Sequence, residues 1–158
     1  MKKTLKYIWL LLLVVLFAMQ FIRPNKNNGG LEGITAFKND TKPSDNVLII
    51  LKKNCFDCHS DSTKYPWYAE IAPISYWLAD HVKEGKGDFN MSAWQTYSIK
   101  KKDHKLEELV EELEEGEMPL DSYTWIHGKL SKEDQERLIQ WATLARIQYQ
   151  DELKVSFK

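Results

Sequence analysis

Cys55, Cys58 and His59 are the residues of this 158-residue chain whose types and spacing most clearly predict chemistry. They form the run Cys55-Phe56-Asp57-Cys58-His59, which holds the only two cysteines and a histidine directly after the second. This spacing is typical of covalent haem attachment. Two thiols on one side of a short helix can add to the vinyl groups of a porphyrin, and the adjacent imidazole can bind the iron. We therefore expect Cys55 and Cys58 to bind haem c and His59 to be the proximal ligand.

Other chemistry for the two cysteines fits the surrounding sequence less well. A dithiol redox site usually lies at a strand-to-helix turn of a βαβ unit, and no such pattern surrounds these residues. A zinc site needs about four ligands, whereas His81, His104 and His127 lie far apart in the sequence. A structural disulfide across so short a loop would constrain little of the unfolded chain and would leave His59 unexplained.

Met118, in the run Glu117-Met118-Pro119-Leu120, is the candidate for the second axial ligand. A methionine thioether can bind iron on the face opposite a histidine, and this pair raises the reduction potential of the haem. Pro119 would stiffen the loop. Methionines also commonly fill hydrophobic cores, and Met91 or His81 could take the same position. The spacing leaves these interpretations open.

Helical periodicity dominates the rest of the chain, and strand signals are nearly absent, which predicts an all-α fold around one haem. A short helix is expected over 47–51, an apolar stripe over 74–81 and a second stripe over 106–113. A final helix is expected after a cap at Ser131, with its inner face over 138–149. Serine caps and Gly116 mark several of the ends. We expect five tryptophans to pack around the porphyrin: Trp67, Trp77, Trp94, Trp125 and Trp141.

Residues 1–23 resemble a targeting segment, because the basic residues Lys2, Lys3 and Lys6 precede the apolar run 7–22. No Ala-x-Ala-like site follows, which favours an uncleaved signal anchor over a removed signal peptide. The run is a little shorter than the roughly 20 residues that a span needs. The lysines should keep the N-terminus in the cytoplasm. The expectation is a single span in a bacterial inner membrane with the haem domain in the periplasm, or a soluble periplasmic protein after cleavage.

The remaining segments divide by composition. Residues 24–43 are rich in Asn, Gly and Lys and predict a flexible linker. The haem-binding domain is expected over 44–150, with a C-terminal tail over 151–158. Four of the 22 basic residues lie within residues 1–23 and all 23 acidic ones lie beyond them. The exported part is therefore net acidic, which disfavours a role in binding nucleic acid.

The chain resembles class I c-type cytochromes in its Cys-x-x-Cys-His helix, late Met-Pro loop and closing helix. It is more closely similar to the bacterial haem-binding domain family of small, exported, cytochrome-c-like proteins. This resemblance covers about residues 54–143 and rests on CFDCHSDSTKYPWY, the stretch 73–85, HKLEELVEELEEGEMPLDSYTWIH and the capped final helix.

The resemblance implies covalent haem at both cysteines, His59 as the proximal ligand and Met118 as the distal one. It also implies that the carbonyl of Pro73, or that of Pro66, accepts a hydrogen bond from the His59 ring. The expected function is a membrane-tethered monohaem cytochrome that exchanges electrons with redox proteins at or in the membrane and has no catalytic residues. The alternatives are a peroxidase-type enzyme with an open sixth site, assisted by His81 or Glu117, and a sensor in which a small gas displaces Met118.

Overall fold

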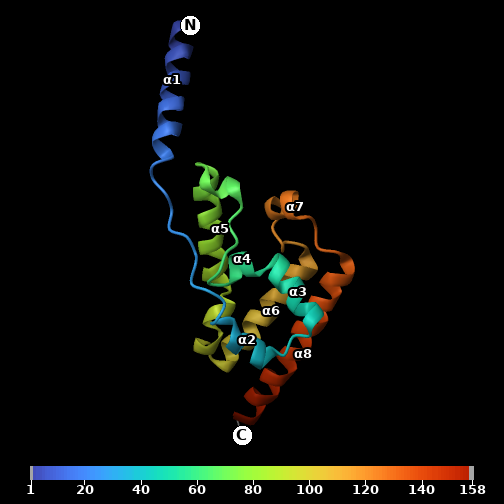
Figure 1. The fold of residues 1–158 in the computed structure, drawn as a ribbon. Coiled ribbons are helices and arrows are strands. Elements are labelled where there is room, and N and C mark those ends of the chain that lie inside the picture. Colours follow the sequence, from blue (N-terminus) through green and yellow to red (C-terminus); the bar gives the residue numbers. More distant parts are fainter. Residues whose placement is uncertain (1, 157–158) are drawn as a thin grey trace.

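The structure, a computed structural model, describes residues 2–156, and within that range the chain is helical (Figure 1). The expected all-α fold is therefore confirmed. The one β pairing in the same range is an isolated bridge between Asn28 and Ser62. The helical segments in chain order are α1 (Lys2–Met19), α2 (Ile34–Thr41), α3 (Asp45–Asn54), α4 (Phe56–His59), η1 (Trp67–Glu70), α5 (Ile74–Asp88), η2 (Met91–Thr96), α6 (Ile99–Glu115), α7 (Asp121–His127) and α8 (Lys132–Ser156).

Serine hydroxyls begin three of these helices. The hydroxyl of Ser44 accepts a hydrogen bond from the backbone of α3, and Ser98 does the same for α6. Ser131 caps α8 by accepting the N–H of Asp134 at 3.1 Å. Each cap satisfies a backbone N–H that has no partner within the helix, which fixes where the helix starts.

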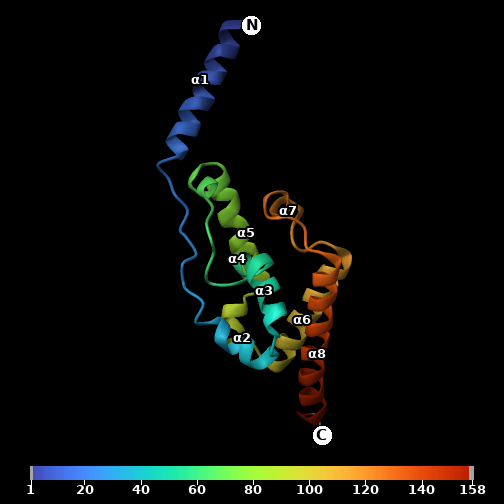
Figure 2. The ribbon, with the colours of Figure 1, turned by 45° about the vertical axis from the view of Figure 1, so that its right-hand side comes forward.

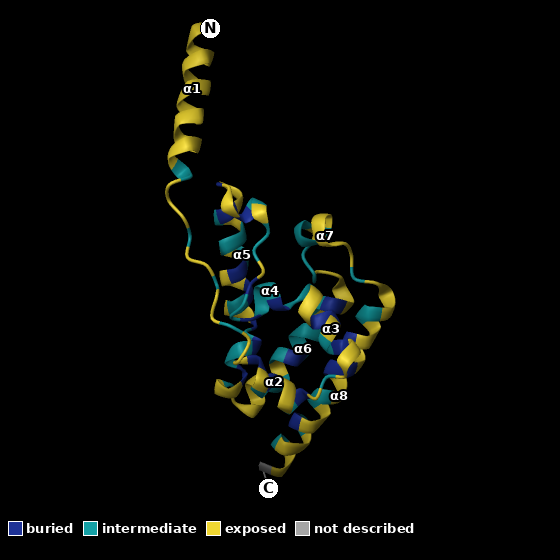
Figure 3. Ribbon diagram, in the orientation of Figure 1, coloured by how far each residue is buried: buried dark blue, intermediate teal, exposed yellow. Residues whose placement is uncertain are grey.

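The core lies where α2, α3, η2, α6 and α8 meet, and its buried residues are among those coloured dark blue in Figure 3. Phe37 of α2 is fully buried there among aromatic rings. Its ring centroid is 5.1 Å from that of Trp94 and 5.8 Å from that of Trp141, both in edge-on geometry. α6 and α8 pack along each other and carry further core residues, including Leu106 and Leu138.

The predicted flexible linker over 24–43 is wrong. Residues 34–41 form α2, and Ile34 and Phe37 are 2% and 0% exposed. Before α2, the Asn27 carbonyl accepts the N–H of Thr63, and Gly29 donates its N–H to the carbonyl of Asp61. The segment therefore belongs to the folded domain, because its few apolar side chains complete the core and its backbone pairs with the loop that follows α4.

The predicted C-terminal tail is also corrected in part. α8 continues to Ser156, so residues 151–156 are helical, and residues 157 and 158 lie outside the described part of the chain.

α1 stands away from the other helices in both views (Figures 1 and 2), and none of its residues is buried. Over residues 2–156 no helix is long and apolar enough to cross a membrane, so the span predicted within residues 1–23 is not found. α1 has 18 residues, and three of them are lysines.

Only two of the five tryptophans that are expected to pack around a porphyrin are buried. Trp94 and Trp141 are buried in the core, whereas Trp67, Trp77 and Trp125 are exposed. The exposed three lie on η1, α5 and α7.

Candidate functional site

The Cys-x-x-Cys-His segment lies at the break between α3 and α4. Cys55 ends α3, and its carbonyl accepts the N–H groups of Cys58 at 3.2 Å and His59 at 2.9 Å. This single turn brings both cysteines and the histidine close together. Both cysteines are free thiols.

α5 packs against this turn through a glycine. A Cβ atom built on Gly85 would lie 3.0 Å from the carbonyl oxygen of Cys58 and 3.1 Å from its Cβ. Both neighbours belong to the backbone or to a short side chain, so they have little freedom to move away. Gly85 thus permits the approach that holds α4 in place.

The His59 ring is oriented by a backbone carbonyl. Its Nδ1 lies 2.9 Å from the carbonyl oxygen of Phe89, at the end of α5. A carbonyl only accepts, so Nδ1 carries the proton and Nε2 keeps a free lone pair in the neutral ring. Burial lowers the pKa of His59, against the opposing effect of the Phe89 carbonyl. The ring is therefore held neutral, with Nε2 unprotonated.

The proposed partner of His59 is corrected by this contact. The carbonyl of Pro73 accepts backbone N–H groups from Tyr76 and Trp77 in the first turn of α5, and Phe89 takes the role assigned to Pro73. Pro66 likewise accepts a backbone N–H, that of Ala69. A backbone acceptor leaves no side-chain pattern in the sequence, so no sequence signal could have identified Phe89.

A cavity of about 330 Å³ adjoins the segment. Cys55, His59 and Met118 all line it, although Met118 comes from a distant part of the chain. Cys58, next to His59 on α4, does not itself line it. The other lining residues are Asn54, Asp88, Phe89, Met91, Lys105, Glu108, Leu109, Glu111, Glu112, Leu113, Pro119, Leu130 and Leu138.

Met118 reaches the cavity because the chain reverses after α6. Gly116 has a φ of +77°, a left-handed conformation that favours glycine and ends the helix. The carbonyl of Glu112 then accepts the N–H groups of Glu117 at 3.0 Å and Met118 at 3.2 Å. Two hydrogen bonds to one carbonyl fold Met118 back over the end of α6 and onto the cavity.

The cavity also contains Met91, which is fully buried in the core. Met91 lies two residues after Phe89, whose carbonyl accepts the hydrogen bond from Nδ1 of His59. Met118 lies on a separate loop and is partly exposed. The two methionines thus approach the cavity from different elements.

Burial also affects the two thiols. It raises the pKa of Cys55 to about 12 and that of Cys58 to about 11, with smaller contributions from the charges of Cys58 and Asp57 respectively. Both groups are therefore protonated at neutral pH.

The side chains of the cavity fit a haem. A porphyrin needs apolar walls, which Phe89, Leu109 and Leu113 supply, and iron needs donors such as the imidazole of His59 and a thioether. A zinc site is not supported, since no group of three or more Cys, His, Asp or Glu side chains in the described range could hold a metal ion.

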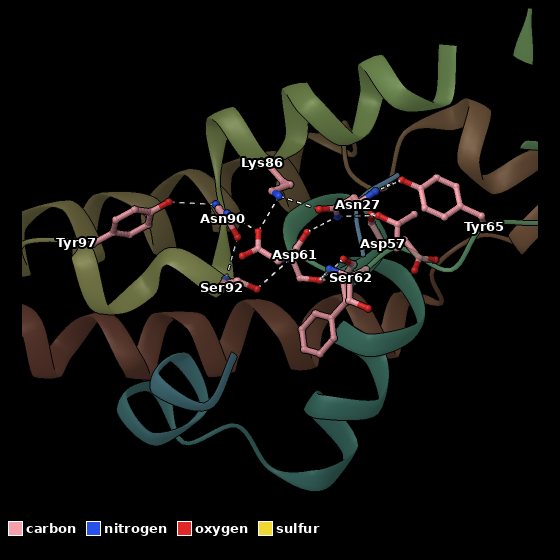
Figure 4. A network of polar contacts seen from close by, with 12 residues as sticks. Asn27, Asp57, Asp61, Ser62, Tyr65, Lys86, Asn90, Ser92 and Tyr97 are labelled. Atoms are coloured by element: carbon pink, nitrogen blue, oxygen red, sulfur yellow. Dashed lines mark hydrogen bonds and ion pairs between the residues drawn. The ribbon is translucent and has the colours of Figure 1, made fainter. Parts of the chain in front are cut away.

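The loop that follows His59 is fixed by a polar network (Figure 4). Asp61 is its centre: its carboxylate accepts from the Lys86 ammonium at 2.7 Å and from the Asn90 amide at 3.1 Å, and its N–H donates to the hydroxyl of Ser92. Lys86 lowers the pKa of Asp61 through this hydrogen bond. α5 and η2 thereby hold the loop from one side.

The N-terminal segment holds the same loop from the other side. The Asn27 amide donates to the carbonyl of Ser60 at 2.8 Å and to the hydroxyl of Thr63 at 2.9 Å, and its oxygen accepts from Lys86. The backbone N–H of Asn27 donates to the hydroxyl of Tyr65 at 2.7 Å. Asn27 carries no signal of this role in the sequence, because its region has the composition of a linker.

The other three histidines do not line the cavity. His81 packs against the ring of Trp77, with 4.5 Å between centroids. His127 stacks on Tyr123 at 4.1 Å, and His104 lies on the exposed side of α6, where its Nε2 is 3.1 Å from Glu108.

Comparison with known proteins identifies one family. A family described as a haem-binding domain matches residues 14–144, which is most of the chain. The match includes α2, the Cys-x-x-Cys-His segment, the cavity and about the first half of α8. No curated protein matches significantly, and no solved structure does.

Proposed function

The chain belongs to the haem-binding domain family, and on this premise we propose that it is a monohaem c-type cytochrome that transfers electrons. One observation carries the proposal: Cys55, His59 and Met118 line a single cavity. An attachment thiol, an imidazole and a thioether are together the donor set of a covalently bound haem with two protein ligands.

Covalent attachment is proposed at both cysteines. Each S–H adds across one vinyl C=C bond of the porphyrin, so that sulfur bonds to one carbon and the hydrogen goes to the other. The addition is neutral in redox terms and consumes both thiols. Cys55 and Cys58 are free and lie on one turn, as two additions at one porphyrin edge require.

The axial ligands are proposed to be Nε2 of His59 and the sulfur of Met118. The Phe89 carbonyl holds Nδ1, so the free lone pair of the ring points to the other side. A second ligand must approach from the opposite face of the porphyrin. Met118 meets this requirement better than Met91. Met91 lies two residues after Phe89, whose carbonyl contacts Nδ1 on the side of the ring opposite the free lone pair.

The bound haem supplies an iron that alternates between ferrous and ferric states. The residues of the chain hold both ligands through that change. Gly116 and the Glu112 carbonyl fix the Met118 loop, and the Asp61 network fixes the turn that carries His59. Ligands held in place need little rearrangement when the charge of the iron changes, which suits electron transfer and requires no catalytic side chain.

We also propose that the chain is exported in a bacterium to the periplasm and held at the inner membrane by α1. Lys2, Lys3 and Lys6 precede an apolar stretch in which every side chain to Phe17 is exposed. At the membrane the carrier would meet its redox partners at a high local concentration. N-terminal sequencing of the mature protein tests the attachment, because a start between residues 23 and 41 would show cleavage.

The absorption spectrum of the purified ferric protein tests the assignment of function. Histidine and methionine ligation predicts a low-spin spectrum with the weak far-red band of an iron-to-thioether bond. A high-spin ferric spectrum would contradict the proposal, since it would indicate an open sixth site of the kind that a peroxidase needs.

A further inference from the structure

A cluster of large apolar side chains is exposed at one end of the domain. It is defined here as the apolar end, and its members are Trp67, Ile71, Ile74, Trp77, Trp125 and Ile126. Trp67 is 77% exposed and Trp125 is 79% exposed. Soluble domains seldom leave several neighbouring aromatic and β-branched residues in water, and such a cluster usually marks a binding surface.

Two separate parts of the chain form the apolar end. The first is η1 with the start of α5, and the second is α7. A polar contact joins them, because the hydroxyl of Tyr68 lies 3.3 Å from Nε2 of His127. Figures 1 and 2 show both parts on the side of the domain that faces α1.

The segment directly after α1 is fixed to this same end by specific hydrogen bonds. The amide group of Gln20 donates to the carbonyl of Ala72 at 3.1 Å and accepts the N–H of Ala72 at 3.0 Å. The hydroxyl of Tyr76 donates to the carbonyl of Ile22 at 2.7 Å. Arg23 pairs with the side chain of Glu70. The end of α1 is therefore tied to η1 and α5 and is not a loose tether.

These contacts place the exposed apolar side chains of α1 next to the apolar end. α1 exposes apolar side chains along its length, and it leaves the domain beside Ile71 and Ile74. A partner or lipid surface that covers the apolar side chains of α1 must therefore also reach Ile71 and Ile74 of the apolar end. Tryptophan is enriched where a bilayer meets water, because its ring is apolar and its N–H can bond to headgroups or water.

We propose that the apolar end lies against the surface of the lipid bilayer and fixes the orientation of the haem domain. The inference rests on the proposed membrane attachment through α1 and names a second, separate contact. α7 begins three residues after Met118, so contact at α7 would bring the Met118 loop toward the membrane. The haem edge on that side would then face redox partners embedded in the bilayer.

The test uses the full-length haem-loaded protein in vesicles of phosphatidylcholine and phosphatidylglycerol that contain a lipid with a photoactivatable carbene precursor in its acyl chain. After illumination, mass spectrometry of peptides locates the labels. We expect labels in α1, in 67–77 and in 121–127. Peptides around Leu144 and Ile147 serve as the control, because these residues are also apolar and exposed but belong to α8. In Figure 1, α8 lies at the far side of the domain from α1.

The outcomes separate the two proposals. Labels in α1 alone would overturn the orientation proposed here and leave the attachment standing. No label in α1 would overturn both. Labels equally strong in α8 would indicate unspecific contact and overturn the orientation. A separate treatment of the same vesicles with a bifunctional carboxyl-reactive cross-linker is the last check. Two copies joined through 67–77 or 121–127 would show that a second copy covers the apolar end, which would also overturn the lipid contact.

Two variants sharpen the test. Trp67→Ser with Trp125→Ser should reduce labelling of 67–77 and 121–127 by at least several-fold while α1 stays labelled. Leu144→Ser with Ile147→Ser should leave every label unchanged. If 67–77 and 121–127 are labelled as strongly in the Trp67 and Trp125 variant as in the original protein, these two residues do not make the contact.

Discussion

Gly85 and Gly87 lie two residues apart in α5 and have opposite surroundings. A Cβ at Gly85 would meet Cys58 at 3.0 Å, whereas a Cβ at Gly87 would meet nothing within 4 Å. Alanine is a better helix former than glycine by about 1 kcal/mol. At Gly85 the steric conflict with the Cys58 backbone works against that gain.

We therefore expect Gly87→Ala to stabilise the protein by about 0.5–1 kcal/mol, and Gly85→Ala to destabilise it by about 1–3 kcal/mol, the usual cost of overpacking. Urea unfolding of both variants measures the difference. Equal stabilisation by the two substitutions would show that α5 does not press on the Cys-x-x-Cys-His turn.

Met118 is the residue on which the ligand assignment depends. Met118→Ala should keep the haem bound, lower the reduction potential and shift the ferric spectrum toward high spin, because the soft thioether that favours ferrous iron is lost. Met91→Ala is the control and should leave the ligation unchanged. Spectra and potentiometric titrations check both variants. If Met118→Ala leaves the spectrum and the potential unchanged while Met91→Ala alters both, the ligand is Met91.

At the scale of the elements, the sequence predicts the helices that have a cap and a periodic apolar face. α3, α6 and α8 begin after serine caps, and each buries part of the apolar face that the periodicity indicates. α2 has no side-chain cap, and it contains only two large apolar residues, Ile34 and Phe37, both of which are buried. Its helix depends on contacts with distant aromatic rings, which no local pattern reveals.

Phe37→Ala tests whether α2 belongs to the core. The Phe37 ring is fully buried among Phe89, Trp94 and Trp141, so its loss should cost about 3–5 kcal/mol in the free energy of unfolding. Lys38→Ala, at an exposed position of the same helix, should change it by less than about 0.5 kcal/mol. Chemical denaturation measures both. A small effect at both positions would restore the interpretation of this segment as a linker.

α6 and α8 are joined by a charge contact that should respond to pH. Arg146 of α8 donates to Asp103 at 3.0 Å and to Glu107 at 2.6 Å. The hydrogen bond from Arg146 lowers the pKa of Glu107 below its usual value of 4.5. Because the pKa is depressed in the folded state, the stabilisation is present above about 4.5 and is lost as the pH falls through the folded value.

Arg146→Gln should therefore lower the urea midpoint clearly at pH 7 and much less at pH 3. Arg137→Gln removes a more exposed pair with Glu133 and should have little effect at either pH. If Arg146→Gln has the same effect at both pH values, the arginine contributes through packing of its stem and not through its charge.

At the scale of the whole molecule, the sequence reveals the Cys-x-x-Cys-His motif and the fold class. It does not reveal which distant residues support the motif in the folded chain. Asn27 and Lys86 hold the loop after His59 through side chains separated by 59 positions. The Phe89 carbonyl orients His59 without any side chain that a pattern could show. Such contacts depend on the folded arrangement, which is why the motif was evident and its supports were not.

The central claim is that one haem is bound covalently to Cys55 and Cys58. The mass of the intact, denatured protein tests it most directly, since denaturation releases a haem that is held only by its ligands. We predict a single species with the mass of the chain plus one haem and no thiol that reacts with iodoacetamide. The double variant Cys55→Ala, Cys58→Ala should show the mass of the chain alone. The mass of the unmodified chain with two reactive thiols in the original protein, and free haem in the solvent, would contradict the claim.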